Sequence, residues 1–577
     1  MNILFPVAAA LVILGLAVRL YGGFIARQVG EDDSRPTPAH TKTDGRDFVP
    51  TRIHVLFAHH FSAIAGAGPI VGPTLGILYG FGPAWLWVVL GTVFFGAVHD
   101  YTALFASIRE GGLSMGEIAG KSLGRSGRFL FLSFTIIMIV LVTSAFLSMT
   151  AMSLTSMWPV DKLSLEPGQT LLHTVVRDGQ TMGVIGGIAS TSVIIITLCA
   201  PFLGWLIYRK GIKTLVGYLL ASAICVVSLV VGFLLPVTLS PPIWMVLMSV
   251  YVLFAAGVPV WIILQPRDFI NVQILYGGML LLVTATLVGG FSGLSINFPT
   301  FSLTSGMEKL GMIWPMLFIT IACGAISGFH ALVASGTTCK QVSSESAARK
   351  IGFGGMALEG ALAVLVLVTV ASSLPYADYL KIVWADTGSN PVLAFALAAG
   401  GLLHNSLGIP IALGAICGIL LIEGFVITTL DAAVRLNRYL FEEFWVLIFP
   451  KVPKIMTKFW FNSGLSVVIM FLMAYFNAFK LIWPLFGSTN QLLAALALIA
   501  VSVWLTLRGR RSWFTLIPAF FMVVTTIASL SILLVDTYIP TGNIALITAD
   551  ILLIVLSLGV IGLSVKKIRS SRKTARV

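Results

Sequence analysis

Charged residues are scarce in this sequence. Only 10% of its 577 residues are Asp, Glu, Lys or Arg, whereas an average soluble protein has roughly 25%. Apolar residues make up 57%, and the mean hydropathy over the whole chain is +0.98. That average excludes a soluble enzyme with one membrane anchor. It also excludes an outer-membrane β-barrel, whose alternating strands average near neutral. The sequence therefore predicts an all-α polytopic membrane protein.

Several motifs of well-known chemistry are also missing. The sequence has no GxxxxGK[ST] phosphate loop, no HExxH and no GxSxG, so nothing indicates an ATP-driven transporter or a hydrolase of those types. The cysteines show no CxxC or CxxH spacing, which supports neither a disulfide framework nor a zinc site; they are Cys199, Cys225, Cys323, Cys339 and Cys417. We therefore expect a protein that is not an enzyme and has no cofactor.

What the sequence has instead is a succession of long apolar runs. A helix needs about 20 apolar residues to cross a membrane. Fifteen candidate spans satisfy this rule, at roughly 3–25, 54–80, 83–108, 129–157, 183–207, 213–236, 242–264, 268–290, 312–338, 351–374, 405–430, 461–479, 483–506, 512–535 and 543–565. The first run is too long for a signal-peptide core, so we expect it to be retained.

Basic residues are distributed unevenly between the loops. About 30 of the 36 Lys and Arg fall in one set of alternate loops, Arg267 among them, and only five fall in the other set. Because loops rich in Lys and Arg stay in the cytoplasm, this pattern predicts an external N-terminus and a cytoplasmic C-terminus. The basic tail 567–577 is interpreted as a topology anchor.

Two spans contain segments that suit a continuous helix poorly. Within 54–80 the residues are Ala65, Gly66, Ala67, Gly68 and Pro69; within 242–264 they are Ala256, Gly257, Val258 and Pro259. Each could be a simple proline kink. Because five spans separate them, however, the two helices run in opposite directions, which is typical of a transporter with inverted repeats and a binding site at mid-membrane. The backbone of both segments is the predicted substrate site.

This pairing predicts the organisation of the whole chain. Two five-helix repeats would occupy 54–236 and 242–430. The remaining parts are an N-terminal extra helix 1–28, a cytoplasmic loop 29–53, a cytoplasmic or interfacial segment 431–460, four C-terminal helices over 461–566 and the basic tail 567–577.

Ionisable residues inside spans are candidates for function because they are costly in lipid. Candidates for proton coupling are His59, His60, His99, Asp100 and His330. A satisfied structural pair is the alternative for His99 and Asp100, each of which should need its own partner. Glu359 and Glu423 could neutralise a cation or take up a proton. Asp431 is expected to pair locally with Arg435, and the polar run 487–491 is expected to cap a helix.

Several of these segments resemble the carbon starvation A (CstA) family of peptide transporters. The similar segments are 59–73, 96–101, 327–332 with 335–338, 428–431 and 487–491, and the resemblance covers roughly residues 50–500. It implies a transporter of the bacterial inner membrane, in the amino acid–polyamine–organocation superfamily, with a LeuT-like core. It also implies peptide uptake during nutrient limitation. A related branch imports pyruvate with protons, and the motifs do not separate the two branches.

The combined interpretation is a secondary transporter that imports small peptides by alternating access, driven by protons or sodium. If sodium is the coupling ion, the superfamily suggests a site formed by Ala65, Ser335, Thr337 and Thr338; the alternative for these hydroxyls is local hydrogen bonding. Two other functions stay open: a proton-coupled symporter of pyruvate or another small carboxylate, and a membrane nutrient sensor that does not transport.

Overall fold

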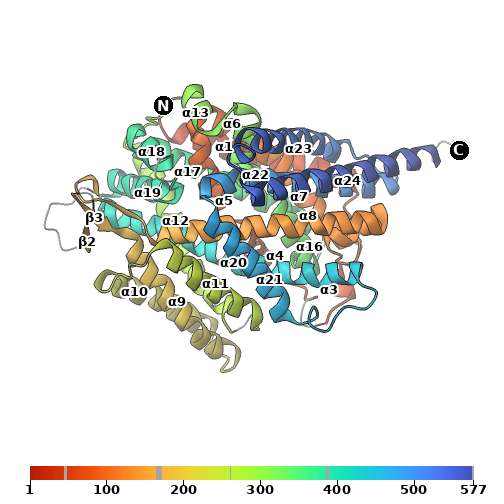
Figure 1. Cartoon of the computed structure of the whole chain (residues 1–577), viewed down its shortest axis with the longest axis horizontal. Helices are drawn as coiled ribbons and strands as arrows, with labels where there is room; N and C mark the ends of the chain where they lie inside the picture. Colours follow the sequence, from red (N-terminus) through yellow and green to blue (C-terminus); the bar gives the residue numbers. More distant parts are fainter. Residues whose placement is uncertain (45–47, 164–171, 178, 260–261, 385–388, 575–577) are drawn as a thin grey trace.

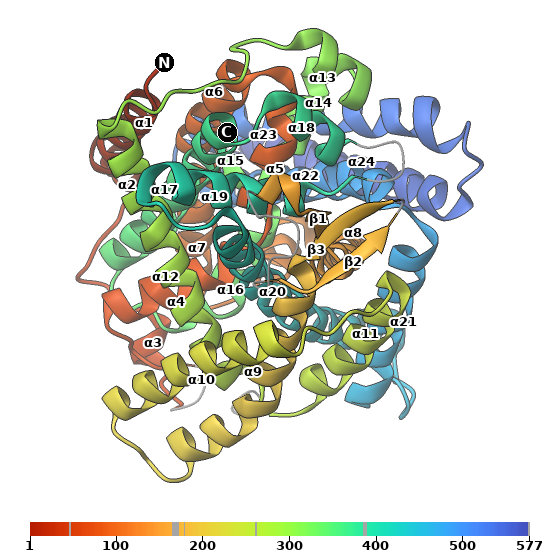
Figure 2. The same ribbon diagram turned by 90° about the vertical axis from the view of Figure 1, so that its left-hand side faces the viewer.

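The computed structural model describes residues 1–44, 48–163, 172–177, 179–259, 262–384 and 389–574, and most of them are helical. The helices pack into one bundle (Figure 1), in which α9 and α10 form a pair at an edge remote from α22–α24 (Figure 2). The three strands form a small antiparallel sheet in the order β1-β3-β2.

The elements are bounded as follows. The first half contains α1 (Leu4–Leu16), a π-helical turn (Ala17–Tyr21), α2 (Gly22–Val29), α3 (Pro38–Thr41), α4 (Ile53–Ile64), α5 (Gly68–Gly76), α6 (Phe81–Gly91), a second π-helical turn (Thr92–Gly96), α7 (Ala97–Arg109), α8 (Met115–Leu154), β1 (Met157–Pro159), β2 (Thr174–Arg177), β3 (Gln180–Val184), α9 (Ile185–Tyr208), α10 (Thr214–Leu234), α11 (Pro241–Gly257) and α12 (Leu264–Phe291). The second half contains α13 (Leu303–Leu310), α14 (Ile313–Thr320), α15 (Ala322–Ala325), α16 (Gly328–Gly336), α17 (Glu345–Ser373), α18 (Tyr376–Val383), α19 (Pro391–Leu407), α20 (Ile411–Ile448), α21 (Phe459–Phe476), α22 (Phe479–Leu507), α23 (Trp513–Ile532) and α24 (Ile544–Thr574).

Twelve helices of the described chain are long and apolar enough to cross a membrane, and the bent pair α4–α5 makes a thirteenth. The chain is therefore a multi-pass membrane protein. The expected number of fifteen is not confirmed, because two predicted spans do not form a long helix. The span expected at 242–264 is the 17-residue α11, and the one expected at 312–338 is divided into α14, α15 and α16.

The first predicted break is present. Helix α4 ends at Ile64, α5 begins at Gly68, and their axes differ by 50°. Ala65 has ψ of 77°, which is not helical, and Pro69 at the start of α5 has no N–H to continue a helix from α4. The glycines then let another segment of the chain approach closely: a Cβ atom at Gly68 would lie 2.2 Å from Cβ of Cys323.

The second predicted break is wrong as a break within a span. Residues 256–259 lie where α11 ends, before the chain turns into α12. The Arg435 guanidinium, which donates to the carbonyls of Ala255 and Val258, lies 24 residues after the start of α20. At 1.5 Å per residue this is about 36 Å along the helix, beyond a hydrocarbon core of about 30 Å. The carbonyls freed at this end of α11 are bound by the Arg435 guanidinium.

The actual second discontinuity is in the span formed by α14, α15 and α16. Ile326 and Ser327 are extended between α15 and α16. This broken span runs antiparallel to α4–α5. Thr51, just before α4, bonds Gln341, which follows the end of α16. Tyr79, just after α5, bonds Gly311, which precedes the start of α14. The two broken spans cross where Gly68 contacts Cys323 and Gly72 contacts Thr320.

Candidate functional site

A buried chain of ionisable side chains connects three helices beside this crossing. The Asp100 carboxylate on α7 binds two imidazoles: His99 Nδ1 is 2.7 Å from Oδ1, and His330 Nδ1 on α16 is 2.7 Å from Oδ2. The other ring nitrogen of His330 lies 3.2 Å from Glu359 Oε2 on α17. All four side chains are inaccessible to solvent. We name this chain, His99–Asp100–His330–Glu359, the carboxylate–imidazole network.

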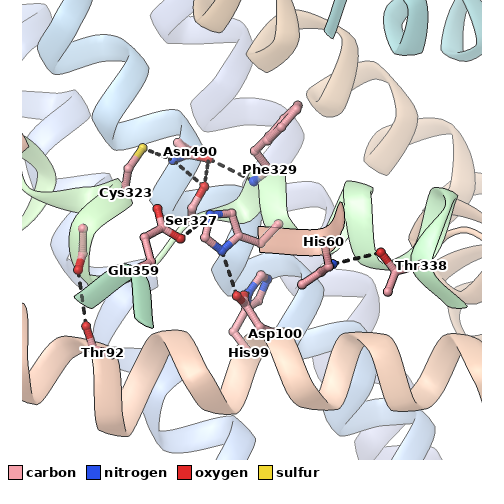
Figure 3. Close-up of polar contacts among 12 residues, drawn as sticks. His60, Thr92, His99, Asp100, Cys323, Ser327, Phe329, Thr338, Glu359 and Asn490 are labelled. Atoms are coloured by element: carbon pink, nitrogen blue, oxygen red, sulfur yellow. Dashed lines mark hydrogen bonds and ion pairs between the residues drawn. The ribbon is translucent and has the colours of Figure 1, made fainter. Parts of the chain in front are cut away.

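The network brings together three of the predicted proton-coupling residues and adds Glu359. Figure 3 shows His99 and Asp100 on one helix and Glu359 on another, with His60 to one side. The expectation that His99 and Asp100 would each need its own partner is wrong, since they bond each other. Because carboxylates alternate with imidazoles, a proton can move between Asp100, His330 and Glu359 with little movement of heavy atoms.

Local packing explains why these side chains meet. The π-helical turn Thr92–Gly96, which directly precedes α7, packs against α15, where Thr92 Oγ1 donates to the Gly324 carbonyl. Helix α17 approaches α7 closely through a glycine, because a Cβ atom at Gly352 would lie 2.8 Å from Cα of Tyr101. π-helical turns are frequent at functional sites.

The two histidines of α4 have different surroundings. His60 is buried, and its Nδ1 lies 2.8 Å from Thr338 Oγ1 after α16. His60 Nε2 has no partner in the described chain. His59 is exposed and interacts electrostatically with Asp268 on α12. His60 therefore joins the two broken spans, and His59 faces a different part of the molecule.

The hydroxyls expected to hold sodium make separate contacts. Ser335 donates to the Ala331 carbonyl and Thr337 to the Val333 carbonyl, both within one turn of their own helix. Thr337 is exposed, and Thr338 contacts His60. In the described residues, no group of three or more His, Cys, Asp or Glu is arranged to hold a metal ion.

Asn490 is a site residue that the sequence argument missed. The run 487–491 was expected to cap a helix, but α22 begins at Phe479, so the run lies in its buried interior. The Asn490 side chain bonds Ser327 and accepts from the N–H of Phe329 at 3.1 Å, which satisfies the start of α16 (Figure 3). The signal was a polar run inside an apolar one, where intramembrane polar groups are costly.

A second buried ionic cluster joins α11, α12 and α20. Arg267 Nη1 lies 2.5 Å from Asp431 Oδ2, and both side chains are buried. Tyr251 donates to the same Asp431 oxygen at 2.9 Å. The local pair predicted between Asp431 and Arg435 is therefore wrong, because Arg435 binds the end of α11. Arg267 was also expected in a loop, but it lies buried in the first turn of α12.

The loops that are rich in Lys and Arg are held together by further ionic contacts. Arg109 pairs with Glu345 at the start of α17 and donates to the Gly30 carbonyl at 2.7 Å. Nearby, Asp33 accepts from the N–H of Ser346. Hydrogen bonds from the Ser346 side chain and from this N–H lower the pKa of the Asp33 carboxyl. The segment after α2 is thereby fixed to the N-terminus of α17, where negative charge is favourable.

Comparison with known proteins identifies the family. The family model described as "Carbon starvation protein CstA" matches residues 2–387 and 377–529. The chain belongs to this family. A CstA relative named "Peptide transporter CstA" from Bacillus subtilis is 32% identical, over 91% of this chain and 89% of its own length.

Another relative carries a different name. The "Pyruvate/proton symporter BtsT" of Escherichia coli is 29% identical, over 92% of this chain and 82% of its own length. Among solved structures, the Eremococcus coleocola manganese transporter is 11% identical with a TM-score of 0.36, covering 92% of this chain and 99% of that one. The CstA relatives thus include proteins named for peptides and for pyruvate.

Proposed function

We propose that this CstA family member is a secondary active transporter that imports small peptides together with protons by alternating access. The observation that carries the proposal is the carboxylate–imidazole network at the crossing of two broken, antiparallel spans. Intramembrane carboxylates paired with histidines mark proton pathways in transporters. The names of the peptide-transporter relatives support the substrate class.

The same geometry supports a LeuT-like core with new repeat boundaries. Each repeat would begin with a broken span, at 53–79 and at 313–336, and the order of helices then corresponds. Helix α6–α7 corresponds to α17, and the 40-residue α8 to the 38-residue α20. The pairs α9 with α21 and α10 with α22 complete repeats 53–234 and 313–507. Helices α11, α12, α18 and α19 are then insertions, and α23 and α24 follow the core.

The backbone at the crossing would bind the two ends of a peptide. Ala67 and Gly68 lie at the start of α5, where N–H groups favour a carboxylate. Carbonyls around Ile321, between α14 and α15, would receive the ammonium group, with Glu359 nearby. Because Gly68 is packed directly against Cys323, α5 and α15 must separate to admit a substrate.

We propose the bacterial cytoplasmic membrane as the location, with the N-terminus outside and the C-terminus inside. The uneven distribution of Lys and Arg supports this orientation.

The test is uptake of labelled dialanine and labelled pyruvate into proteoliposomes, driven separately by inward proton and inward sodium gradients. We expect dialanine to accumulate under the proton gradient. Accumulation under sodium alone would move the coupling site away from the network. Accumulation of pyruvate alone would assign the chain to the carboxylate branch. Binding of dialanine by folded protein without accumulation of either solute would favour a sensor.

A further inference from the structure

Glu423 is a buried carboxyl group outside the carboxylate–imidazole network. It lies in the middle of α20, and 1% of its surface is exposed. Neither of its oxygens has a hydrogen-bond partner in the described chain. The Ser153 hydroxyl of α8 faces it, but that hydroxyl also lacks a partner at bonding distance. An ionised carboxylate in this position would have lost its hydrating water without gaining hydrogen bonds from the protein in return.

The carboxyl faces a small cavity with a mixed polar and apolar lining. This cavity, between α9, α12 and α20, is lined by Glu423, Arg267, Asn271 and Thr197 among others. It has room for about one water molecule. A second cavity of similar size lies beside it and shares Asn271 and Gly424 with the first.

The second cavity lies beside a partly exposed acid. It is lined by Ser62 of α4 and by Asp268, Asn271 and Thr428. The Asp268 side chain is 36% exposed, and the exposed His59 interacts with it. Two single-water cavities that share Asn271 therefore lie between the partly exposed Asp268 and the buried Glu423.

The charges around Glu423 do not neutralise it. On α12 the charged groups are Arg267 and Asp268; on α20 the nearest is Asp431. The lining residues of α9, Val193 and Thr197, carry no charge. Among the described residues that line this cavity Arg267 is the one cation, and it already contacts Asp431 at 2.5 Å and Asp268 at 3.4 Å. Asp268 is partly exposed and interacts with His59, but Glu423 and Asp431 are both buried. Two buried carboxylates beside one guanidinium are too costly unless one acid is neutral.

We propose that Glu423 holds a proton in this conformation and that this crevice is a second proton-binding site, reached from solvent through Asp268. On release the carboxyl O–H bond breaks, the proton passes to cavity water, and the carboxylate remains beside Arg267. The part this proton plays in transport rests on the proposed function, but its presence on Glu423 does not.

Infrared difference spectroscopy of the full-length protein in detergent tests this site without any transport. A pH jump is applied, and the C=O stretching band of protonated carboxyl groups is recorded. We expect Glu423→Gln to lose one such band and to release one proton fewer per chain. Glu423→Asp keeps a carboxyl group and should retain the band at a shifted frequency. This shift assigns the band to residue 423 even if the Gln variant fails to fold. The matched control is Glu308→Gln, an exposed residue of α13, which should leave the spectrum unchanged.

The route has its own readout. Asp268→Asn should keep the Glu423 band but slow its response to the pH jump at least several-fold. An unchanged response overturns the route, and a Glu423→Gln spectrum identical to wild type overturns the site. If wild-type protein shows the band but no dialanine uptake, the proton site stands and the proposed function fails.

Discussion

Asp100 connects two imidazoles, so replacing it affects both at once. In Asp100→Asn the side chain keeps its size, but one oxygen becomes an N–H donor and the negative charge is lost. We expect concentrative dialanine uptake to fall at least 100-fold, because His330 then lacks the acid that stabilises its protonated form. Exchange of labelled for unlabelled dialanine should persist, since it needs no net proton movement. Unchanged accumulation would remove Asp100 from the mechanism.

The Arg267–Asp431 contact is a structural prediction at the same scale. Asp431→Asn leaves Arg267 buried with only partial compensation from Asp268. Removing one partner of a buried ion pair costs about 3–5 kcal/mol, and we expect about 3 kcal/mol here. The midpoint of thermal unfolding of the purified protein should fall clearly below that of Asp536→Asn, an exposed control. Equal midpoints for the two variants would show that the contact contributes little.

At the residue scale the sequence predicted candidates but not their partners. Asp100, His330 and Glu359 stood out because ionisable residues are rare in apolar runs. Their contact could not be predicted, since it depends on how α7 packs against α16 and α17, which lie more than 200 residues later in the chain. His60 with Thr338 is a similar case: both were candidates, but for different ions.

At the scale of elements, the crossing of the broken spans depends on small residues. Gly68→Ala places a methyl group where Cys323 now lies, so α5 and α15 cannot pack as closely. We expect dialanine uptake to fall at least ten-fold through a loss in the maximal rate. Adding Cys323→Gly should restore much of it by removing the opposing side chain.

Gly277→Ala is the matched control for this substitution. Gly277 is in α12 with open space around its Cα, so the added methyl group should not impair uptake. If Gly68→Ala transports as well as Gly277→Ala, the close packing at the crossing has no role in the cycle.

The two breaks show how far the sequence predicted the elements. Gly66, Gly68 and Pro69 disfavour a continuous helix by their own chemistry, so the first break was predictable. The second lies at Ile321 and at Ile326–Ser327, residues that fit a helix well. It arises from tertiary contacts, including Asn490 at the start of α16. At 256–259 the Gly-x-Pro pattern marked the end of a helix instead.

At the scale of the whole molecule, the orientation in the membrane can be measured. Val176 is exposed on β2, beyond the end of α8 opposite the basic loops, whereas Arg511 lies in the basic loop before α23. We expect a membrane-impermeant thiol reagent to label Val176→Cys in intact cells. Arg511→Cys should be labelled only after permeabilisation. The reverse pattern would invert the topology.

The helical class and most span positions followed from hydropathy, because transfer of apolar residues into lipid dominates the folding of such a chain. The number of long spans could not be predicted in this way, since hydropathy cannot distinguish a continuous helix from three short ones. The repeats were assigned from the wrong second break for the same reason.

The central claim is that peptide and proton cross together. The most direct measurement is the external pH of a weakly buffered proteoliposome suspension when dialanine is added without any imposed gradient. The account predicts that the external medium becomes alkaline in proportion to the dialanine taken up, and that Asp100→Asn abolishes this change. Dialanine entry into wild-type proteoliposomes with no change in external pH would contradict it.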